Sequence, residues 1–188
     1  MCIRDRYKKV GATMGVYLNP DNNRYERLCN SPIFVDKSLL IEYTNKAINT
    51  SNDCICVTRP RRFGKSTDAN MLVAYYSKGT NSKDLFNTLN INHCPSFLEH
   101  LNKHNVIHLN IQDFLSTTNS IDEMLVKITW MILKDLKFEF KDVITETEII
   151  DAFNEVYAYT KNKFIFIIDE WDCIFSCLLY TSPSPRDK

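Results

Sequence analysis

Short apolar runs alternate with helix-like segments along this chain. Residues 54–57, 106–111 and 164–168 are almost continuously apolar, which is typical of strands that are buried on both faces. Between the second and third runs, apolar residues recur at the spacing of helices that cover a core with one face. The alternation predicts an α/β fold with a mainly parallel sheet and helices on both sides of it.

Polar residues mark the expected helix boundaries in the first half of the chain. Residues 7–33 are rich in polar and turn-forming residues and are expected to be an irregular lead-in. Asp36 is expected to cap a short helix whose buried face would comprise Leu39, Leu40, Tyr43 and Ala47. A second helix should follow residue 64, with an apolar face made by Ala69, Leu72, Val73 and Tyr76.

The second half of the chain has its own helix signals. Residues 86–103 predict short helical pieces that break at Pro95. Further on, Ser120 with Glu123 and Thr145 with Glu148 are expected capping boxes, because each hydroxyl residue precedes a glutamate by three positions. The apolar sides of the two helices would comprise Ile121, Met124, Leu125, Ile128 and Ile132 in the first, and Ile149, Phe153, Val156 and Tyr157 in the second.

Composition narrows the class of protein only slightly. The 188 residues fit one domain, and 23 basic against 23 acidic residues give no reason to expect a nucleic-acid or anionic-membrane surface. No apolar run is long enough to span a membrane, and the N-terminus does not resemble a secretory signal. The seven cysteines are an odd number without paired spacing, which argues against a disulfide framework and indicates the reducing cytoplasm.

Both ends of the chain resemble translated adapter DNA. Back-translation of residues 1–6 (MCIRDR) gives a DNA segment whose reverse complement encodes residues 177–181 (CLLYT) in another frame. Unrelated segments of one protein have no reason to encode opposite strands of one DNA element, although a chance inverted repeat is the alternative. We therefore expect residues 1–6 and 177–188 to be adapter-derived, and residues 34–176 to be one domain that is truncated at its C-terminus.

Residues 58–67 (TRPRRFGKST) lie between a predicted strand and a predicted helix. In this position Gly64 would let the backbone approach a phosphate group, Lys65 would reach the β- and γ-phosphates, and Ser66 would bind Mg²⁺. The full phosphate-loop pattern has a glycine where this chain has Arg59. Since Gly-Lys-Ser alone is common by chance, a solvated basic turn is the alternative for this stretch.

The last predicted strand ends abruptly at Asp169 and Glu170. Two carboxylates are costly in an apolar core, so they should lie at the carboxyl edge of the sheet, where ligands of open α/β sheets bind. One carboxylate could hold Mg²⁺ through water while the other polarises an attacking water molecule. An ordinary polar strand end is the alternative. Asn110 and Asp113 could line the same edge, although a simple strand end is favoured for them.

Four segments of the chain, taken in their order along the sequence, resemble the motifs of a known family. They are residues 34–38 (FVDKS), 59–66 (RPRRFGKS), 75–76 (YY) and 167–172 (IIDEWD). They resemble the predicted AAA-ATPase-like family of bacteria, whose motifs are similar to VDKT, RPRRFGKS and LIDEYD. The resemblance covers residues 33–176 and implies a P-loop NTPase-type αβα sandwich that binds ATP. Arg59 in place of the first glycine is then a family feature, whereas Ser38 and Trp171 depart from the usual Thr and Tyr.

The resemblance also implies roles for individual residues. Asp169 and Ser66 would bind Mg²⁺, and Glu170 would activate water beside the catalytic Lys65. The expected nucleotide-binding residues are Arg59, Pro60, Arg61, Arg62, Phe63, Gly64, Lys65, Ser66 and Thr67. Expected partners are ATP and, in the full-length protein, a C-terminal nuclease-like domain or further copies of the chain in a homo-oligomer. No membrane partner is expected, and a nucleic-acid partner stays open.

Other polar residues allow more than one interpretation. Arg61 and Arg62 could contact phosphate or nucleic acid, or pair with acidic neighbours. Asp36 and Lys37 favour a structural role over nucleotide contact.

The histidines and cysteines offer weaker alternatives. His100, His104 and His108 recur every four residues, as zinc ligands on one helix face would, but His108 falls in a predicted strand. Cys54 and Cys56 are expected to be small apolar packing residues.

The sequence therefore predicts an ATP hydrolase that uses Mg·ATP. A nucleotide-gated switch or scaffold with little turnover is the first alternative, and a P-loop kinase with an Arg-rich lid is the second. The γ-phosphate sensor and the arginine finger of such ATPases would lie beyond Ser176. We therefore expect this chain by itself to be a poor ATPase with an uncovered sheet edge.

Overall fold

The computed structural model describes residues 15–58, 60 and 62–175 of the chain. The expected adapter-derived ends, and Arg59 and Arg61 of the expected phosphate loop, lie outside these residues. The described part is built on a sheet of two parallel strands, β1 (Asn105–Asn110) and β2 (Phe164–Asp169). The expected α/β class with a parallel sheet is therefore confirmed.

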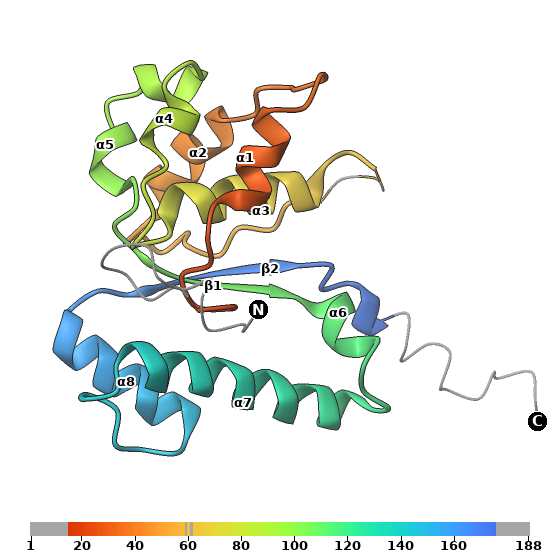
Figure 1. The fold of residues 1–188 in the computed structure, drawn as a ribbon, viewed down its shortest axis with the longest axis vertical. Coiled ribbons are helices and arrows are strands. Elements are labelled where there is room, and N and C mark those ends of the chain that lie inside the picture. Colours follow the sequence, from red (N-terminus) through yellow and green to blue (C-terminus); the bar gives the residue numbers. More distant parts are fainter. Residues whose placement is uncertain (1–14, 59, 61, 176–188) are drawn as a thin grey trace, which may run out of the picture.

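Helices cover both faces of this sheet. Those before β1 are α1 (Asn23–Cys29), α2 (Leu39–Ala47), α3 (Lys65–Tyr76), α4 (Lys83–Phe86), the 3₁₀ helix η2 (Asn90–His93) and α5 (Phe97–His100). The crossover from β1 to β2 contains α6 (Ile111–Leu115), α7 (Ile121–Glu139) and α8 (Ile149–Thr160). Figure 1 shows the first group on one face of the sheet and α7 and α8 on the other. The short pieces around Pro95 agree with the sequence prediction.

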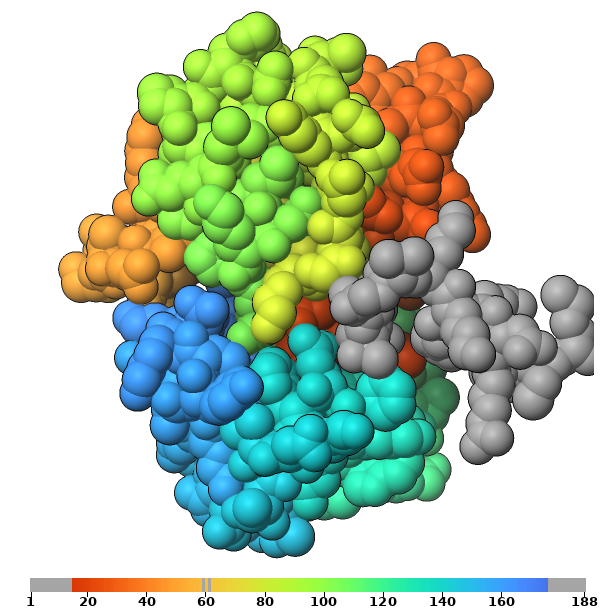
Figure 2. All heavy atoms as spheres, turned by 60° about the vertical axis from the view of Figure 1, so that its left-hand side comes forward, coloured from red at the N-terminus to blue at the C-terminus, as the bar shows by residue number. Residues whose placement is uncertain are grey.

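Alternate strand residues contribute to two separate hydrophobic clusters. Val106 and Ile167 pack with α3 and its neighbouring helices, whereas Ile107 and Leu109 pack with α7 and α8. Successive side chains of a strand point to opposite faces, so one continuous apolar run can supply both clusters. The predicted strands at 106–111 and 164–168 are confirmed, with ends that differ by one residue. In Figure 2 the helices that precede β1 form one lobe, and the segments from α7 onward form the other.

An N-terminal segment, residues 15–19, runs along the outer edge of β1, and we call it the strap. His108 N donates to Tyr17 O at 2.9 Å, and Asn19 N donates to Val106 O at 2.7 Å. These bonds satisfy backbone groups that an edge strand would otherwise expose.

Helix α7 holds the strap from the other side. Asp135 Oδ2 accepts the N–H groups of Tyr17, at 2.7 Å, and Leu18, at 3.2 Å. Gly15 is needed at this approach because a Cβ there would lie 2.7 Å from Asp135 Oδ2 and 2.5 Å from Leu18 O. The carboxylate therefore fixes the strap between β1 and α7.

The lead-in expected over residues 7–33 is more regular than its polar composition suggests. Leu18 is fully buried against the α7 cluster, and Tyr25 of α1 is buried in the α3 cluster. The Tyr25 ring stacks on Phe86 with centroids 5.3 Å apart. The prediction of irregular structure is wrong for residues 23–29, where Tyr25, Leu28 and Cys29 stand at the i, i+3, i+4 spacing of one helix face and pack into the α3 cluster.

Residues 54–57 do not form the strand that their apolar composition predicts. They lie on the surface, with Cys54 and Cys56 exposed, and no strand pairs with them among the described residues. A strand satisfies its backbone groups through a neighbouring strand, and none of the described residues supplies one here. The prediction that the two cysteines are buried packing residues is wrong for the same reason.

The face that α2 buries is rotated from the expected one. The buried residues are Ile41 and Asn45, whereas Tyr43 is 63% exposed. Its N-cap residue is Ser38, and Asp36 instead accepts the Ser38 N–H at 2.8 Å. Asn45 is buried because its side chain bonds to other helices, a contact that no apolar period reveals.

One of the two expected capping boxes is present in part, because Ser120 caps the helix but the Glu123 carboxylate accepts the N–H of Asn119 and not that of Ser120. Glu123 N donates to Ser120 Oγ at 3.1 Å at the start of α7. Thr145 does not cap α8, whose N-cap residue is Glu148, because the Thr145 hydroxyl donates to Glu155 Oε1 at 2.6 Å. Residues expected on buried helix faces but found exposed are Leu39, Tyr43, Leu125 and Tyr157.

Candidate functional site

The expected phosphate loop leads directly into α3. Gly64 is the N-cap residue with φ +83°, and Arg62 has φ +68°. Left-handed backbone is costly for residues other than glycine, so the chain turns sharply twice before the helix. The Gly64 carbonyl accepts the Asp68 N–H at 2.9 Å, and no described side chain caps the helix. The N–H groups of the first turn therefore lack a side-chain acceptor and can receive an anion.

A pocket of about 500 Å³ opens at this N-terminus of α3. One wall comes from the loop and the first turn of α3, and the other comes from residues that follow β1 and β2. Its lining residues are Arg62, Gly64, Lys65, Ser66, Thr67, Gln112 and Glu170. Because β1 and β2 are parallel, their carboxyl ends meet at one edge, and this edge faces the loop.

The two carboxylates at the end of β2 take different positions. Asp169 is the last residue of the strand, is only 7% exposed, and accepts the Glu170 N–H on Oδ1 at 3.0 Å. Glu170 has φ +53° and lines the pocket. A left-handed backbone costs a residue other than glycine about 1–2 kcal/mol, and such strain concentrates at functional sites. Asp169 itself does not line the pocket, but its carboxylate accepts a hydrogen bond from the backbone N–H of Glu170, which does.

Part of the expected nucleotide site is therefore gathered in one place. Arg62, Gly64, Lys65, Ser66 and Thr67 line the pocket together with Glu170. Pro60 and Phe63 do not line it, and the Phe63 side chain is exposed.

The family model described as Predicted AAA-ATPase matches residues 23–184 of the chain. The chain belongs to this AAA-ATPase-like family. No curated protein and no solved structure matches it. Membership suggests ATP binding, and all residues that line the pocket fall within the matched segment. Among the described residues, no helix has the length and apolar character that crossing a membrane requires.

In this AAA-ATPase-like chain, a lysine outside the pocket contacts the loop. Lys37 Nζ donates to Phe63 O at 2.8 Å and forms an ion pair with Asp68 Oδ1 at 3.2 Å. A Cβ on Gly64 would lie 2.7 Å from the same Nζ. The sequence signal that could have revealed the ion pair is Asp68, a carboxylate on the buried side of α3 that requires a cation.

Gln112 is the pocket residue that sequence reasoning missed. Asn110 and Asp113 were the candidates after this strand, yet neither lines the pocket. The Asn110 side chain instead accepts the Gln112 N–H at 3.0 Å and caps α6. This cap fixes the backbone of Gln112 at the carboxyl edge of the sheet, where Gln112 lines the pocket together with Lys65.

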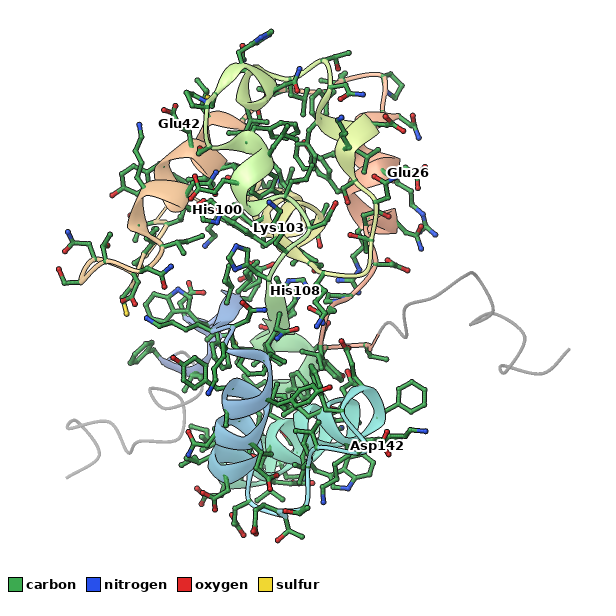
Figure 3. All side chains as sticks on the ribbon, turned by 90° about the vertical axis from the view of Figure 1, so that its left-hand side faces the viewer. Glu26, Glu42, His100, Lys103, His108 and Asp142 are labelled. Carbon is green, nitrogen blue, oxygen red and sulfur yellow. The ribbon has the colours of Figure 1, made fainter. Side chains whose placement is uncertain are left out.

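The three regularly spaced histidines do not share one site. His100 Nδ1 and His104 Nε2 lie 3.0 Å apart, and burial lowers the pKa of His104 to about 4. His108 lies on β1, as expected, and burial lowers its pKa as well. Figure 3 shows His100 among the helices above the sheet and His108 at the level of the sheet. The described residues contain no group of three or more His, Cys, Asp or Glu side chains that could hold a metal ion.

Proposed function

We propose that the pocket at the N-terminus of α3 binds ATP with Mg²⁺ and that the full-length protein hydrolyses it. The observation that carries the proposal is the meeting of residues 64–67 with Glu170 in one pocket, although they lie far apart in the sequence. The uncapped first turn of α3 offers backbone N–H groups to the phosphates. Lys65 adds a positive charge at the same place. Family membership supports ATP as the ligand.

The oxygen groups near the pocket fit a magnesium ion. Mg²⁺ prefers oxygen ligands, keeps several waters, and in nucleotide sites needs only one or two protein groups beside the phosphates. Ser66 would supply a hydroxyl, and Asp169 a carboxylate acting through water. When bound, the ion would neutralise charge that develops on the phosphate oxygens. Glu170 would orient the attacking water and accept its proton.

The binding part of the proposal is tested with Lys65→Ala. With ATP at about 100 times its dissociation constant, ligand binding stabilises a protein by about 2.7 kcal/mol, which is about 5–10 °C in melting temperature for a chain of this size. We expect Mg·ATP to produce such a shift in the wild type. Loss of a charged contact to phosphate should weaken affinity about 10- to 150-fold in Lys65→Ala. Lys83→Ala, which removes an exposed lysine outside the pocket, is the control. A wild-type protein without a shift contradicts the proposal.

The hydrolysis part is tested with Glu170→Gln in the full-length protein. Removal of a general base should reduce phosphate release about 10²- to 10⁴-fold while ATP still binds. Asp172→Asn removes the same charge two residues away, outside the pocket lining, and should leave the rate unchanged. Equal and negligible phosphate release by wild type and Glu170→Gln would instead indicate a nucleotide-gated switch.

A further inference from the structure

We propose that Lys37 is a positioning residue of the nucleotide site. From outside the pocket, its ammonium group holds the phosphate loop in the shape that presents backbone N–H groups to phosphate. The inference rests on the proposed function for its ligand, but the contacts that carry it belong to the loop itself.

The Lys37 ammonium group bridges the two sides of Gly64. It binds the carbonyl of Phe63, immediately before Gly64, at 2.8 Å, and the carboxylate of Asp68, in the first turn of α3, at 3.2 Å. Asp68 in turn donates its backbone N–H to the Gly64 carbonyl at 2.9 Å. The loop residue and the helix that follows it are thus held by one cation.

The bond to the Phe63 carbonyl determines which way the next N–H points. Across a planar trans peptide, the carbonyl of one residue and the N–H of the next point in opposite directions. Because the Phe63 carbonyl points at Lys37, which does not line the pocket, the Gly64 N–H points away from Lys37. Gly64 itself lines the pocket, so this orientation turns its N–H toward the space where a phosphate would bind.

Lys37 is itself held in place on both sides by η2. Asp36 Oδ2 accepts Asn90 N at 2.9 Å, and the fully buried Ser38 accepts Ile91 N on Oγ at 3.1 Å. Burial alone would raise the pKa of Asp36, but its hydrogen bonds from Asn90 and Ser38 outweigh burial and lower it. The backbone of Lys37 therefore has a fixed position from which its side chain can reach the loop.

The charge of Lys37 is balanced before any ligand arrives. Its partner Asp68 has a side chain only 6% exposed, and the Lys37 side chain is 26% exposed. A buried ion pair presents little net charge to an anion, so attraction of phosphate by Lys37 itself is a minor contribution. What the pair supplies is geometry, and this separates Lys37 from Lys65, which lines the pocket.

The test distinguishes a role of Lys37 in shaping the phosphate loop from a role in folding stability alone. Lys37→Met alone leaves Asp68 buried without its cation, so the decisive protein is the double variant Lys37→Met/Asp68→Leu, which removes both charges. We expect the double variant to remain folded, with a urea midpoint lowered only by the loss of the hydrogen bond from Lys37 to the Phe63 carbonyl, while its affinity for Mg·ATP and for inorganic tripolyphosphate falls about tenfold or more. Lys37→Arg, which keeps a donor for Phe63 and Asp68, should restore most of the affinity. Lys46→Met is the control, because Lys46 forms its ion pair with Glu42 within α2.

A second measurement keeps the inference independent of ATP. Hydrogen exchange of the amides that close the first turn of α3, measured without nucleotide, should be about tenfold faster in the double variant. Wild-type affinity in the double variant, or unchanged exchange, would overturn the positioning role. If the wild type binds no Mg·ATP while exchange still depends on Lys37, the proposed function fails and the loop-holding role of Lys37 stands.

Discussion

Gly64→Ala tests the contact between the phosphate loop and Lys37 most directly. The substitution adds a methyl group at a position with φ +83°, where the new Cβ would lie 2.7 Å from Lys37 Nζ. The next contact, with Thr67 Cβ at 3.6 Å, is ordinary van der Waals distance. The perturbation therefore has two parts, the left-handed backbone and the displaced ammonium group.

The structure allows both parts to be estimated. Left-handed backbone costs a residue with a Cβ roughly 1–2 kcal/mol. A displaced ammonium group loses a charged hydrogen bond to the Phe63 carbonyl, which contributes about 1.5–3 kcal/mol. We therefore expect Gly64→Ala to lower the free energy of unfolding by about 2.5–5 kcal/mol. Gly79→Ala is the matched control for the first part, because Gly79 has φ +90° in an exposed turn.

Urea unfolding of a double-mutant cycle separates the two parts. In a Lys37→Met background no ammonium group remains to be displaced, so Gly64→Ala should cost only the backbone term of roughly 1–2 kcal/mol. Mutations that share a contact depart from additivity by more than about 0.5 kcal/mol. If Gly64→Ala costs the same in both backgrounds, the ammonium group does not lie against Gly64 and the reasoning about the loop is wrong.

Three further predictions concern folding stability, measured by urea unfolding. Asp135→Ala, which removes the acceptor of two strap N–H groups, should cost about 1–3 kcal/mol; a loss no larger than that of the exposed Asp142→Ala (Figure 3) would contradict this. Burial lowers the pKa of His104 from 6.5 to about 4. As the pH falls through this range, the unfolded chain therefore binds a proton at His104 that the folded protein does not bind, which favours unfolding. Stability should then drop by on the order of 1–2 kcal/mol between pH 7 and 4, after allowance for solvent screening, and His104→Phe should flatten the slope; an unchanged slope would rule out this origin. Leu136→Ala empties a fully buried site and should cost about 2–5 kcal/mol, against less than about 1 kcal/mol for the half-exposed Leu125→Ala on the same helix, and equal losses would contradict the assignment of the buried face.

The sequence predicts the elements whose buried residues produce a recognisable apolar pattern along the chain. Residues 106–111 are largely buried on both faces, whereas residues 164–168 leave Phe166 and Ile168 about half exposed, but both apolar runs are long enough to identify the strands. Residues 54–57 show the same pattern but form no strand, because strand formation also requires a neighbour that the local sequence does not specify. Composition misses α1 for the converse reason, since only Tyr25, Leu28 and Cys29 of this polar segment pack into the core.

One part of the candidate site could likewise be predicted from the sequence, and another part could not. The meeting of the loop with Glu170 could be predicted, because parallel strands place their carboxyl ends at one edge. The contact of Lys37 with the Phe63 carbonyl could not, since a backbone acceptor leaves no trace in the identity of the residue that carries it. Gln112 was missed because a cap formed by Asn110, not a motif, places it in the pocket.

The strap makes the two edges of the sheet unequal for further assembly. On the β1 side, His108 N and Val106 O are already bonded to the strap, so another strand cannot add there without displacing it. On the β2 side, no further strand is paired among the described residues, and the neighbouring side chains of Phe166 and Ile168 are about half exposed. Among the described residues, the edge at which a further strand can join is therefore the one beside β2. The sheet can grow in one direction, and the two N–H bonds to Asp135 help to fix which direction that is.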